Sequence, residues 1–526
     1  MRKINTIALF FLPLISLFSS CEKDSIEHNS YIGPGEVEVR GELIDIRKWI
    51  SGEKLFPQHN AYFVPSEAEE LFEHPVKYAV SLMEYAGPTS VRAGSDCLVT
   101  IAVDLKEMPA EYIPTGKSFV AGDITYNLFE LKLCAGKWAE LSRPADSCCS
   151  LIVFAENLSV DCADIPGTVI AQIPELRRGA INNVSLAILP DGSYIAACTG
   201  ASTKTRVSLF LSKNGGCEWN LLENTNVAEN RIRNYYNLFV HNGSLYMSGV
   251  GDGNSDILIS RSDDSGRTWT VPEDGISGII KKGTYHSSAV AVVVSGGRIW
   301  RAMEQVTDGK KYPFVMSAPE DSDLLDASLW TFTNTIELGE GFNYNSHPIN
   351  ELIEGNMVAT PDGKIYNLLR ASCTATSAAG VALPVSDVVN LATPSSTWLI
   401  TLPGGGKKFT VRYDPLSRKY WTITNPAASA GLKHKGIYSS GITFDLMRNR
   451  MVLLYSNDLI NWVQFKEIVT DRDPFFHGFQ YVDWQFDGDD IVAVCRMACP
   501  ERRGLPERQH DANLMTFHRI RKFRNL

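Results

Sequence analysis

The amino-acid sequence predicts an all-β protein in which a six-bladed β-propeller follows a small β-rich, sandwich-like domain. Three observations support this prediction: a recurring hairpin unit, a recurring tight turn that contains Asp, Gly and Trp, and a composition with 40 glycines and 10 tryptophans, which suits a turn-rich β protein. The chain has 526 residues, of which 44% are hydrophobic and 21% are charged. It therefore has ample material for buried cores.

The hairpin unit sets the number of blades. From Gly167 onward, a strand-turn-strand unit recurs at intervals of about 50 to 70 residues, a spacing typical of repeat architectures such as propellers. Most of its turns stand between two apolar, β-rich runs, as a hairpin requires. The turns are Pro190–Gly192, His241–Gly243, Ser295–Gly297, Pro361–Gly363, Asp414–Ser417 and Phe486–Gly488. Six turns predict six blades, and we assign residues 165–526 to the propeller.

A second motif recurs in the same region. Residues 262–269 read Ser-x-Asp-x-Gly-x-Thr-Trp, which is the Asp-box pattern; a close variant starts at Ser212 and a shortened form at Ser456. The Ser and Asp or Asn side chains can accept bonds from backbone donors of a tight turn, Gly can adopt the left-handed conformation, and Trp can pack between sheets. We interpret the following residues as structural: Ser262, Asp264, Gly266, Thr268, Trp269, Ser212, Asn214, Gly216 and Trp219.

Residues 36–164 precede this region and are less regular. Stretches such as Val76–Leu82 and Cys97–Val103 partly alternate between apolar and polar residues, which predicts strands. We assign these residues to a small β-rich domain that serves as a spacer or binds glycans. Its five cysteines allow a disulfide, with free thiols as the alternative: Cys97, Cys134, Cys148, Cys149 and Cys162.

The first residues resemble an export signal. Arg2 and Lys3 precede an apolar run, Ile4–Phe18, that ends in Ser19, Ser20 and Cys21. We expect residues 1–20 to be a lipoprotein signal peptide, Cys21 to be lipidated and residues 21–35 to be a tether. The protein would then be exported and anchored by lipid to the outer membrane, at the cell surface or on the periplasmic face. A secretory signal that is cleaved elsewhere is the alternative.

Charge and metal-ligand spacing limit the partners. The net charge of −10 argues against nucleic acid, whose phosphates repel an acidic protein. No Cys/His spacing resembles a zinc site. We expect a carbohydrate partner and neither a metal nor another cofactor.

Several stretches between Gly167 and Phe523 resemble the sialidase superfamily, and in particular sialidase-like proteins of unassigned activity in glycan-degrading bacteria. They are His286–Glu304, Glu354–Asn356, Lys407–Asp414, His477–Trp484 and His510–Asn513. The resemblance implies a propeller fold. It also implies a site with three arginines on the substrate carboxylate, a tyrosine nucleophile activated by a glutamate, and an aspartate as acid and base.

These roles have candidates in this sequence. Tyr481 is the expected nucleophile, Glu354 or Glu304 its base, and Asp483 or Asp511 the acid. Each also has a structural alternative, as a core aromatic ring or a hydrogen-bonded carboxylate.

Three arginines follow the hairpin turns of the third, fourth and sixth blades: Arg301, Arg370 and Arg496. We expect them to emerge at a similar height and to bind a carboxylate, with salt bridges elsewhere as the alternative. Further expected substrate contacts are Arg412, His286, His477, Gln480 and His510. Two departures weaken the resemblance: the family's Arg-Ile-Pro segment is absent, and the loop after Arg496 is basic.

Three functions fit the sequence. The first is an exo-acting glycoside hydrolase that acts on surface or periplasmic glycans, with an acidic sugar as one expected substrate. The second is a glycan-binding surface lipoprotein without catalysis. The third is a structural or protein-binding propeller. Because the first two both present a polar, aromatic-lined face, the sequence does not separate them.

Overall fold

The computed structural model describes residues 36–525, apart from 42–43, 53–54, 56–62, 73–75, 83–88, 142–150, 162–164, 203–205, 435–436 and 502. Within these ranges almost all regular structure is β, as predicted. The helices are short 3-10 turns, none of which is long enough to cross a membrane: η1 (Ala68–Leu71), η2 (Val227–Glu229), η3 (Ala327–Leu329), η4 (Ser396–Trp398) and η5 (Phe523–Asn525). The predicted leader and tether, with Cys21, Cys148, Cys149 and Cys162, lie outside the described residues.

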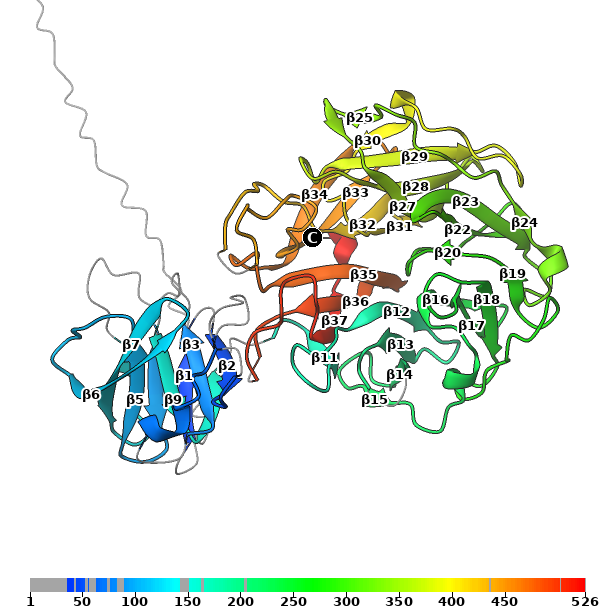
Figure 1. Cartoon of the computed structure of the whole chain (residues 1–526). Coiled ribbons are helices and arrows are strands. Elements are labelled where there is room, and N and C mark those ends of the chain that lie inside the picture. The colour runs from blue at the N-terminus through cyan, green and yellow to red at the C-terminus, as the bar shows by residue number, and fades with distance from the viewer. Residues whose placement is uncertain are drawn as a thin grey trace, which may run out of the picture.

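Residues 36–161 form two sheets (Figure 1). The first has the order β10-β1-β4-β8, from β1 (Glu36–Arg40), β4 (Ser90–Ala93), β8 (Ala139–Glu140) and β10 (Asn157–Asp161). The second has the order β2-β3-β9-β5-β7-β6, from β2 (Ile44–Lys48), β3 (Tyr78–Leu82), β5 (Cys97–Val103), β6 (Tyr112–Ala121), β7 (Ile124–Leu133) and β9 (Leu151–Ala155). One hydrophobic cluster joins Val39 of the first sheet to Ile101 and Val153 of the second. The two sheets therefore pack against each other, while Cys97 and Cys134 are free thiols.

The later strands form six further antiparallel sheets of four or five strands, arranged around a common centre in Figure 1. Their strands, sheet by sheet, are β12 (Asn182–Ile188), β13 (Tyr194–Thr199), β14 (Val207–Ser212) and β15 (Asn220–Leu221); β16 (Asn234–His241), β17 (Ser244–Val250), β18 (Ile257–Ser262) and β19 (Ile279–Lys281); β20 (Tyr285–His286), β21 (Val293–Ser295), β22 (Arg298–Thr307), β23 (Lys310–Pro319) and β24 (Thr331–Phe332); β27 (Glu351–Ala359), β28 (Ile365–Ser372), β29 (Ala379–Val385) and β30 (Leu399–Thr401); β31 (Thr410–Asp414), β32 (Lys419–Thr424), β33 (Arg450–Ser456) and β34 (Trp462–Thr470); and β11 (Thr168–Gln172), β35 (Gly478–Asp487), β36 (Asp490–Ala498) and β37 (Leu514–Ile520). A small hairpin, β25 (Asn343–Tyr344) with β26 (His347–Pro348), lies before β27.

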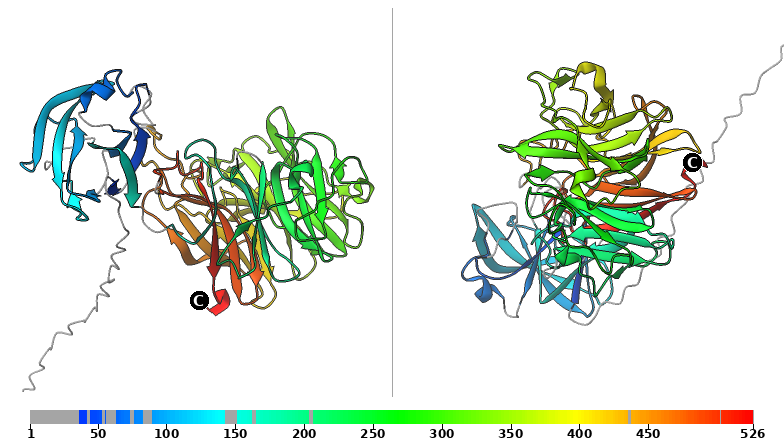
Figure 2. Two further views of the ribbon diagram at one scale, coloured as in Figure 1. Left: turned by 90° about the horizontal axis from the view of Figure 1, so that it is seen from below. Right: turned by 90° about the vertical axis from the view of Figure 1, so that its right-hand side faces the viewer.

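The last of these sheets joins the two ends of the region. Strand β11 pairs with β37, with Thr168 opposite Phe517, so the first strand completes the sheet of the last three. No strand in the described ranges is shared between these sheets and those of residues 36–161, and Figure 2 shows the two groups from perpendicular directions. The result is an all-β, propeller-like architecture.

The tight turn at residues 262–269 is held by its own side chains. Asp264 accepts hydrogen bonds from the Thr268 backbone and hydroxyl, at 2.8 and 2.7 Å, and Ser262 Oγ accepts one from Gly266 N at 2.9 Å. Gly266 has φ +89°, and a Cβ there would lie 2.7 Å from Ile195 of the preceding sheet. The turn therefore requires glycine for both conformation and space.

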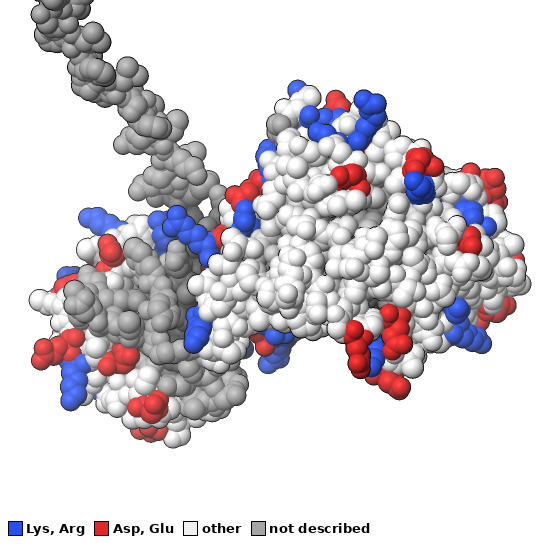
Figure 3. Space-filling model, turned by 90° about the horizontal axis from the view of Figure 1, so that it is seen from above, with Lys and Arg blue, Asp and Glu red and all other residues white. Residues whose placement is uncertain are grey.

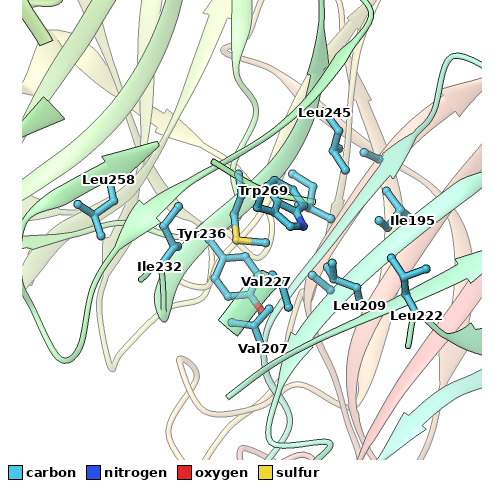
Figure 4. Packing of buried hydrophobic residues seen from close by; sticks show 14 of the residues in the cluster. Ile195, Val207, Leu209, Leu222, Val227, Ile232, Tyr236, Leu245, Leu258 and Trp269 are labelled. Atoms are coloured by element: carbon cyan, nitrogen blue, oxygen red, sulfur yellow. The ribbon is translucent and has the colours of Figure 1, made fainter. Parts of the chain in front are cut away.

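The same turn supplies a buried ring to the contact between the first two sheets. Trp269 is 4% exposed and donates from Nε1 to Gly266 O at 2.9 Å. It packs in one cluster with Ile195 and Leu209 of the first sheet and Leu245 of the second (Figure 4). The equivalent Trp219 makes the same bond within its own turn, at 3.2 Å, but is only half-buried.

Candidate active site

Four of the six sheets carry the same irregularity near the start of their innermost strand, the strand nearest the common centre (Figure 1). The register of β12, β16, β27 and β35 shifts there, as at a β-bulge. One residue of each bulge has a left-handed backbone: Asn183, Tyr235, Glu354 and Tyr481, with φ of 52°, 52°, 54° and 52°. Such a conformation is unfavourable for Tyr and Glu, and bulges often aim side chains near active sites.

Glu354 and Tyr481 are linked through Arg370. Arg370 Nη1 donates to Glu354 Oε2 at 2.9 Å, and Tyr481 contributes, after Glu354, to the raised pKa of the same guanidinium. Burial opposes ionisation of Glu354, but the charge of Arg370, with a smaller contribution from His286, outweighs it and lowers the pKa of the carboxyl. For Arg370, burial is likewise outweighed, mainly by Glu354, and its pKa is raised. Both partners are therefore charged at neutral pH.

Two more guanidinium groups surround the Tyr481 ring. Arg496 lies 4.9 Å and Arg448 5.3 Å from the ring centroid. Arg496 donates to His510 O at 2.7 Å, Arg448 donates to the Gln480 side chain, and each leaves a fully buried Nε without a described partner. Burial lowers the pKa of Arg496 to about 10, so it too remains charged near pH 7.

This positive charge is local to the site. Arg370, Arg448 and Arg496 are 9%, 3% and 5% exposed, whereas the surface seen in Figure 3 mixes acidic and basic side chains with broad uncharged areas. Arg370 pairs with the ionised Glu354, and the ionised Asp511 acts on Arg496. The three guanidinium groups outnumber these two carboxylates, which suits an anionic group of a ligand.

A histidine and a glutamate form a second buried pair. His286 Nδ1 lies 2.7 Å from Glu304 Oε2, and the two residues are 7% and 0% exposed. The Tyr235 ring packs on the imidazole, with centroids 4.2 Å apart. Tyr235 also interacts electrostatically with Tyr481, Glu354 and Glu304, although burial is the main cause of its raised pKa. The pair therefore belongs to the same cluster as Glu354 and Tyr481.

Asp483 and Arg412 lie in a different pocket. The Asp483 carboxylate accepts bonds from Ser185 Oγ and Leu186 N, both at 2.9 Å, and lies 3.8 Å from Arg412 Nη2. These residues line a hollow of about 360 Å³, together with others from innermost strands that include Ile188, Asn237 and Gln485. Asp483 is two residues beyond Tyr481 on the far side of the bulge, which explains the different direction of its side chain.

Arg301 differs from the expectation that placed it beside Arg370 and Arg496. It is 1% exposed, donates to Tyr235 O at 3.1 Å and makes no described contact with Glu354 or Tyr481. Counted from the first residues of β22 and β36, Glu304 rather than Arg301 stands level with Arg496, six residues into its strand. Burial lowers the pKa of Arg301 to about 9.

The remaining expected residues border the arginines or support them. Gln480 is fully buried and donates to Gln509 O and His510 O. His510 Nδ1 lies 2.8 Å from Asp511 Oδ1. His477 instead pairs with Asp473, at 3.1 Å, and with Asp471.

Tyr235, Arg448 and Asn183 were not expected from the sequence. The position of Tyr235 in its strand is a signal for it. Tyr235 lies six residues before the end of β16, as Tyr481 lies six residues before the end of β35. Arg448 stands in a loop before β33 and has no periodic signal. Within the described ranges, no group of three or more His, Cys, Asp or Glu side chains is arranged to hold a metal ion.

No protein-family model matches the chain, and no curated protein matches its sequence. Similar solved structures include a Penicillium chrysogenum α-L-arabinanase complexed with arabinobiose, at 14% identity over 68% of this chain and 98% of that chain, with a TM-score of 0.42. A Hadza microbial sialidase is 11% identical over 91% and 99% of the two chains, with a TM-score of 0.46. A Trypanosoma rangeli sialidase is 13% identical over 69% and 59%, with a TM-score of 0.43.

Proposed function

We propose that the chain is an exo-acting glycoside hydrolase with a sialidase-like, six-bladed propeller, and that Tyr481 is its nucleophile and Glu354 the base that activates it. The observation that supports this assignment is that Arg370 bonds to Glu354 and also interacts electrostatically with Tyr481, although the two come from different sheets. Each of them occupies a left-handed bulge. A tyrosine attacks only when a neighbouring base takes its proton.

The charges around the pair suit this chemistry. The lowered pKa of Glu354 keeps it ionised and able to accept the Tyr481 proton. Arg370 occupies Glu354 Oε2, and no described group bonds to Oε1. The guanidinium groups near the Tyr481 ring stabilise the negative charge that a phenolate nucleophile carries.

We propose an acidic sugar as substrate, held by Arg370, Arg448 and Arg496. The positions of Arg448 and Arg496 beside the Tyr481 ring support this, because guanidinium groups bind carboxylates through parallel hydrogen bonds. Arg448 replaces Arg301 in this assignment.

We also propose that the enzyme is an exported lipoprotein anchored through Cys21, with residues 36–164 and 165–526 as two domains. The basic, apolar and small residues that precede Cys21 support the anchor. Mass spectrometry of the protein from membranes, compared with Cys21→Ser, tests it: the native protein should carry acyl chains and the variant should not.

Hydrolysis of fluorogenic glycosides tests the function. The panel is the 4-methylumbelliferyl glycosides of N-acetylneuraminic acid, glucuronic acid and L-arabinofuranose. The native protein should hydrolyse at least one acidic member. Tyr481→Phe and Glu354→Gln should each lower kcat by about a thousandfold, within the range for removal of a nucleophile or its base. Tyr413→Phe, a half-buried tyrosine of β31, is the matched control and should remain active. Binding without release of the fluorophore would identify a binding protein.

A further inference from the structure

A tyrosine nucleophile needs a second group that gives a proton to the leaving oxygen. Two carboxyls, Asp483 and Asp511, were the expected acids, and both are unsuited by position or ionisation. Asp483 is 2% exposed and bound to Ser185 and Leu186 in the pocket beside Arg412. Burial opposes ionisation of Asp511, but His510 and Arg508 outweigh it and hold its pKa at about 2. Asp511 therefore has no proton to give near pH 7.

Glu304 is also unsuited to contact substrate directly. It is 0% exposed, its Oε2 bonds to His286 Nδ1, and its Oε1 lies 3.5 Å from Gly355 N, beside the Glu354 bulge. A carboxylate that binds one ring nitrogen of a histidine fixes the tautomer and leaves the other nitrogen for proton exchange. This is the geometry of an oriented histidine.

The other ring nitrogen of His286 is available. No described group hydrogen-bonds to its Nε2, and this atom is not among the fully buried polar atoms that lack a partner, so it retains access to solvent. The Tyr235 ring packs on one side of the imidazole. Glu304, which binds His286, also accepts a bond from Gly355 N at 3.5 Å, so the His286–Glu304 pair lies beside Glu354, the nucleophile's base.

We propose that His286, oriented by Glu304, is the proton donor and acceptor of this site; the inference rests on the proposed hydrolase function. In the first step the Tyr481 oxygen bonds to the anomeric carbon and its proton passes to Glu354. The bond to the leaving oxygen breaks as protonated His286 gives that oxygen its Nε2 proton.

In the second step neutral His286 takes a proton from water, whose oxygen bonds to the anomeric carbon. The bond to Tyr481 breaks, and the phenolate regains its proton from Glu354. One water is consumed and each side chain returns to its starting state. His286 is then a catalytic residue, and Glu304 is the residue that positions it.

The dependence of rate on the leaving group tests this role. The probes are the 4-nitrophenyl and methyl glycosides of the one sugar that the native protein hydrolyses fastest. Nitrophenolate leaves with little protonation, whereas methoxide requires it. For His286→Asn, release of methanol should therefore fall by about 10²- to 10⁴-fold, the range for lost general acid catalysis. The burst of nitrophenol should fall less than tenfold.

A second readout separates a chemical role from a structural one. Azide needs no base, so it should restore nitrophenyl turnover in His286→Asn and yield the glycosyl azide. His286→Gln provides the same comparison if the Asn variant does not fold. Glu304→Gln should reduce kcat for the methyl glycoside more than KM. The control is His518→Gln, an equally buried histidine of β37 at 7% exposure, which should leave both rates unchanged.

If His286→Asn loses rate equally on both glycosides, or does not respond to azide, the role of His286 is overturned. The roles of Tyr481 and Glu354 are then unaffected. A native protein that releases no sugar from any glycoside of the panel would overturn the hydrolase function itself. The two failures are therefore distinguishable.

Discussion

Glu354 and Tyr481 are equivalent residues of two different sheets, since each is the left-handed residue at the bulge of an innermost strand, with φ of 54° and 52°. Asn183 and Tyr235 occupy the same place in two more sheets. The repeated bulge thus turns four polar side chains away from the regular strand alternation. Two of them become the proposed nucleophile and its base.

The first prediction concerns the backbone strain at this bulge. Glu354→Gly should be more stable than Glu354→Ala by about 1 kcal/mol, because only glycine adopts positive φ without a steric cost. Both variants lose the bond to Arg370, so their difference isolates the backbone. At Glu351, an extended position of the same strand, alanine should be the more stable residue. Urea unfolding of the Gly and Ala variants at Glu354 and Glu351 measures both differences. If the same residue is the more stable one at both positions, the left-handed backbone at Glu354 is contradicted.

The second prediction concerns the packing of the Asp-box tryptophan. Trp269→Ala should lower the free energy of unfolding by about 3 to 5 kcal/mol, the range for deletion of a buried aromatic side chain. Trp219→Ala should cost less, because Trp219 is only half-buried. Thermal melting and glycan binding measure the effects, and ligand specificity should not change. An unchanged melting temperature in Trp269→Ala would show that this ring does not stabilise the contact between sheets.

The third prediction concerns the anionic subsite. Arg448→Gln should weaken binding of glucuronic acid by about tenfold to a hundredfold, because a hydrogen bond to a charged group is worth about 1.5 to 3 kcal/mol. Binding of glucose, the neutral counterpart, should not change. Arg450→Gln is the control, since Arg450 pairs with Glu467 away from the site. Calorimetry measures the affinities. Equal losses for both sugars would remove Arg448 from the subsite.

The fourth prediction concerns pH. Burial lowers the pKa of His477, but Asp473, Cys499 and Asp471 outweigh it and raise the pKa to about 10, above the usual value of about 6.5. A raised pKa in the folded state stabilises the protein fully below about pH 6.5, and this contribution is lost as pH rises toward 10.

The stability difference between the native protein and His477→Gln should therefore shrink by roughly 1.4 kcal/mol per pH unit over this window. Chemical denaturation at several pH values measures it. Replacement of the exposed His347 by Gln should leave the native profile unchanged. Parallel curves for the native protein and His477→Gln would contradict the linkage.

The all-β fold could be predicted from the sequence because its signals are local. The turn at Pro190–Gly192 does connect β12 to β13, and the motif at Ser262 does begin where β18 ends. Turn chemistry depends on neighbouring residues only, so a single sequence reveals it.

The site was harder to predict because it depends on the register of strand pairing and on positive φ angles at single residues. Counting from the hairpin placed Arg301 beside Arg370 and Arg496, whereas in the structure Glu304 stands level with Arg496 and Arg301 bonds to Tyr235 O. A left-handed Tyr or Glu has no sequence signature, since glycine and asparagine are the usual residues there. Arg448 reaches Tyr481 from a loop, and only the folded chain brings them together.

Covalent trapping identifies the residue that bonds to the sugar. The native protein is incubated with a fluorinated glycosyl fluoride of the sugar it hydrolyses fastest, because fluorine beside the anomeric carbon slows the second step more than the first. Peptide mass spectrometry then locates the sugar. We expect one adduct, on Tyr481, that is absent in Tyr481→Phe. An adduct on Tyr235 or Glu354, or steady turnover without any adduct, would contradict Tyr481 as the nucleophile.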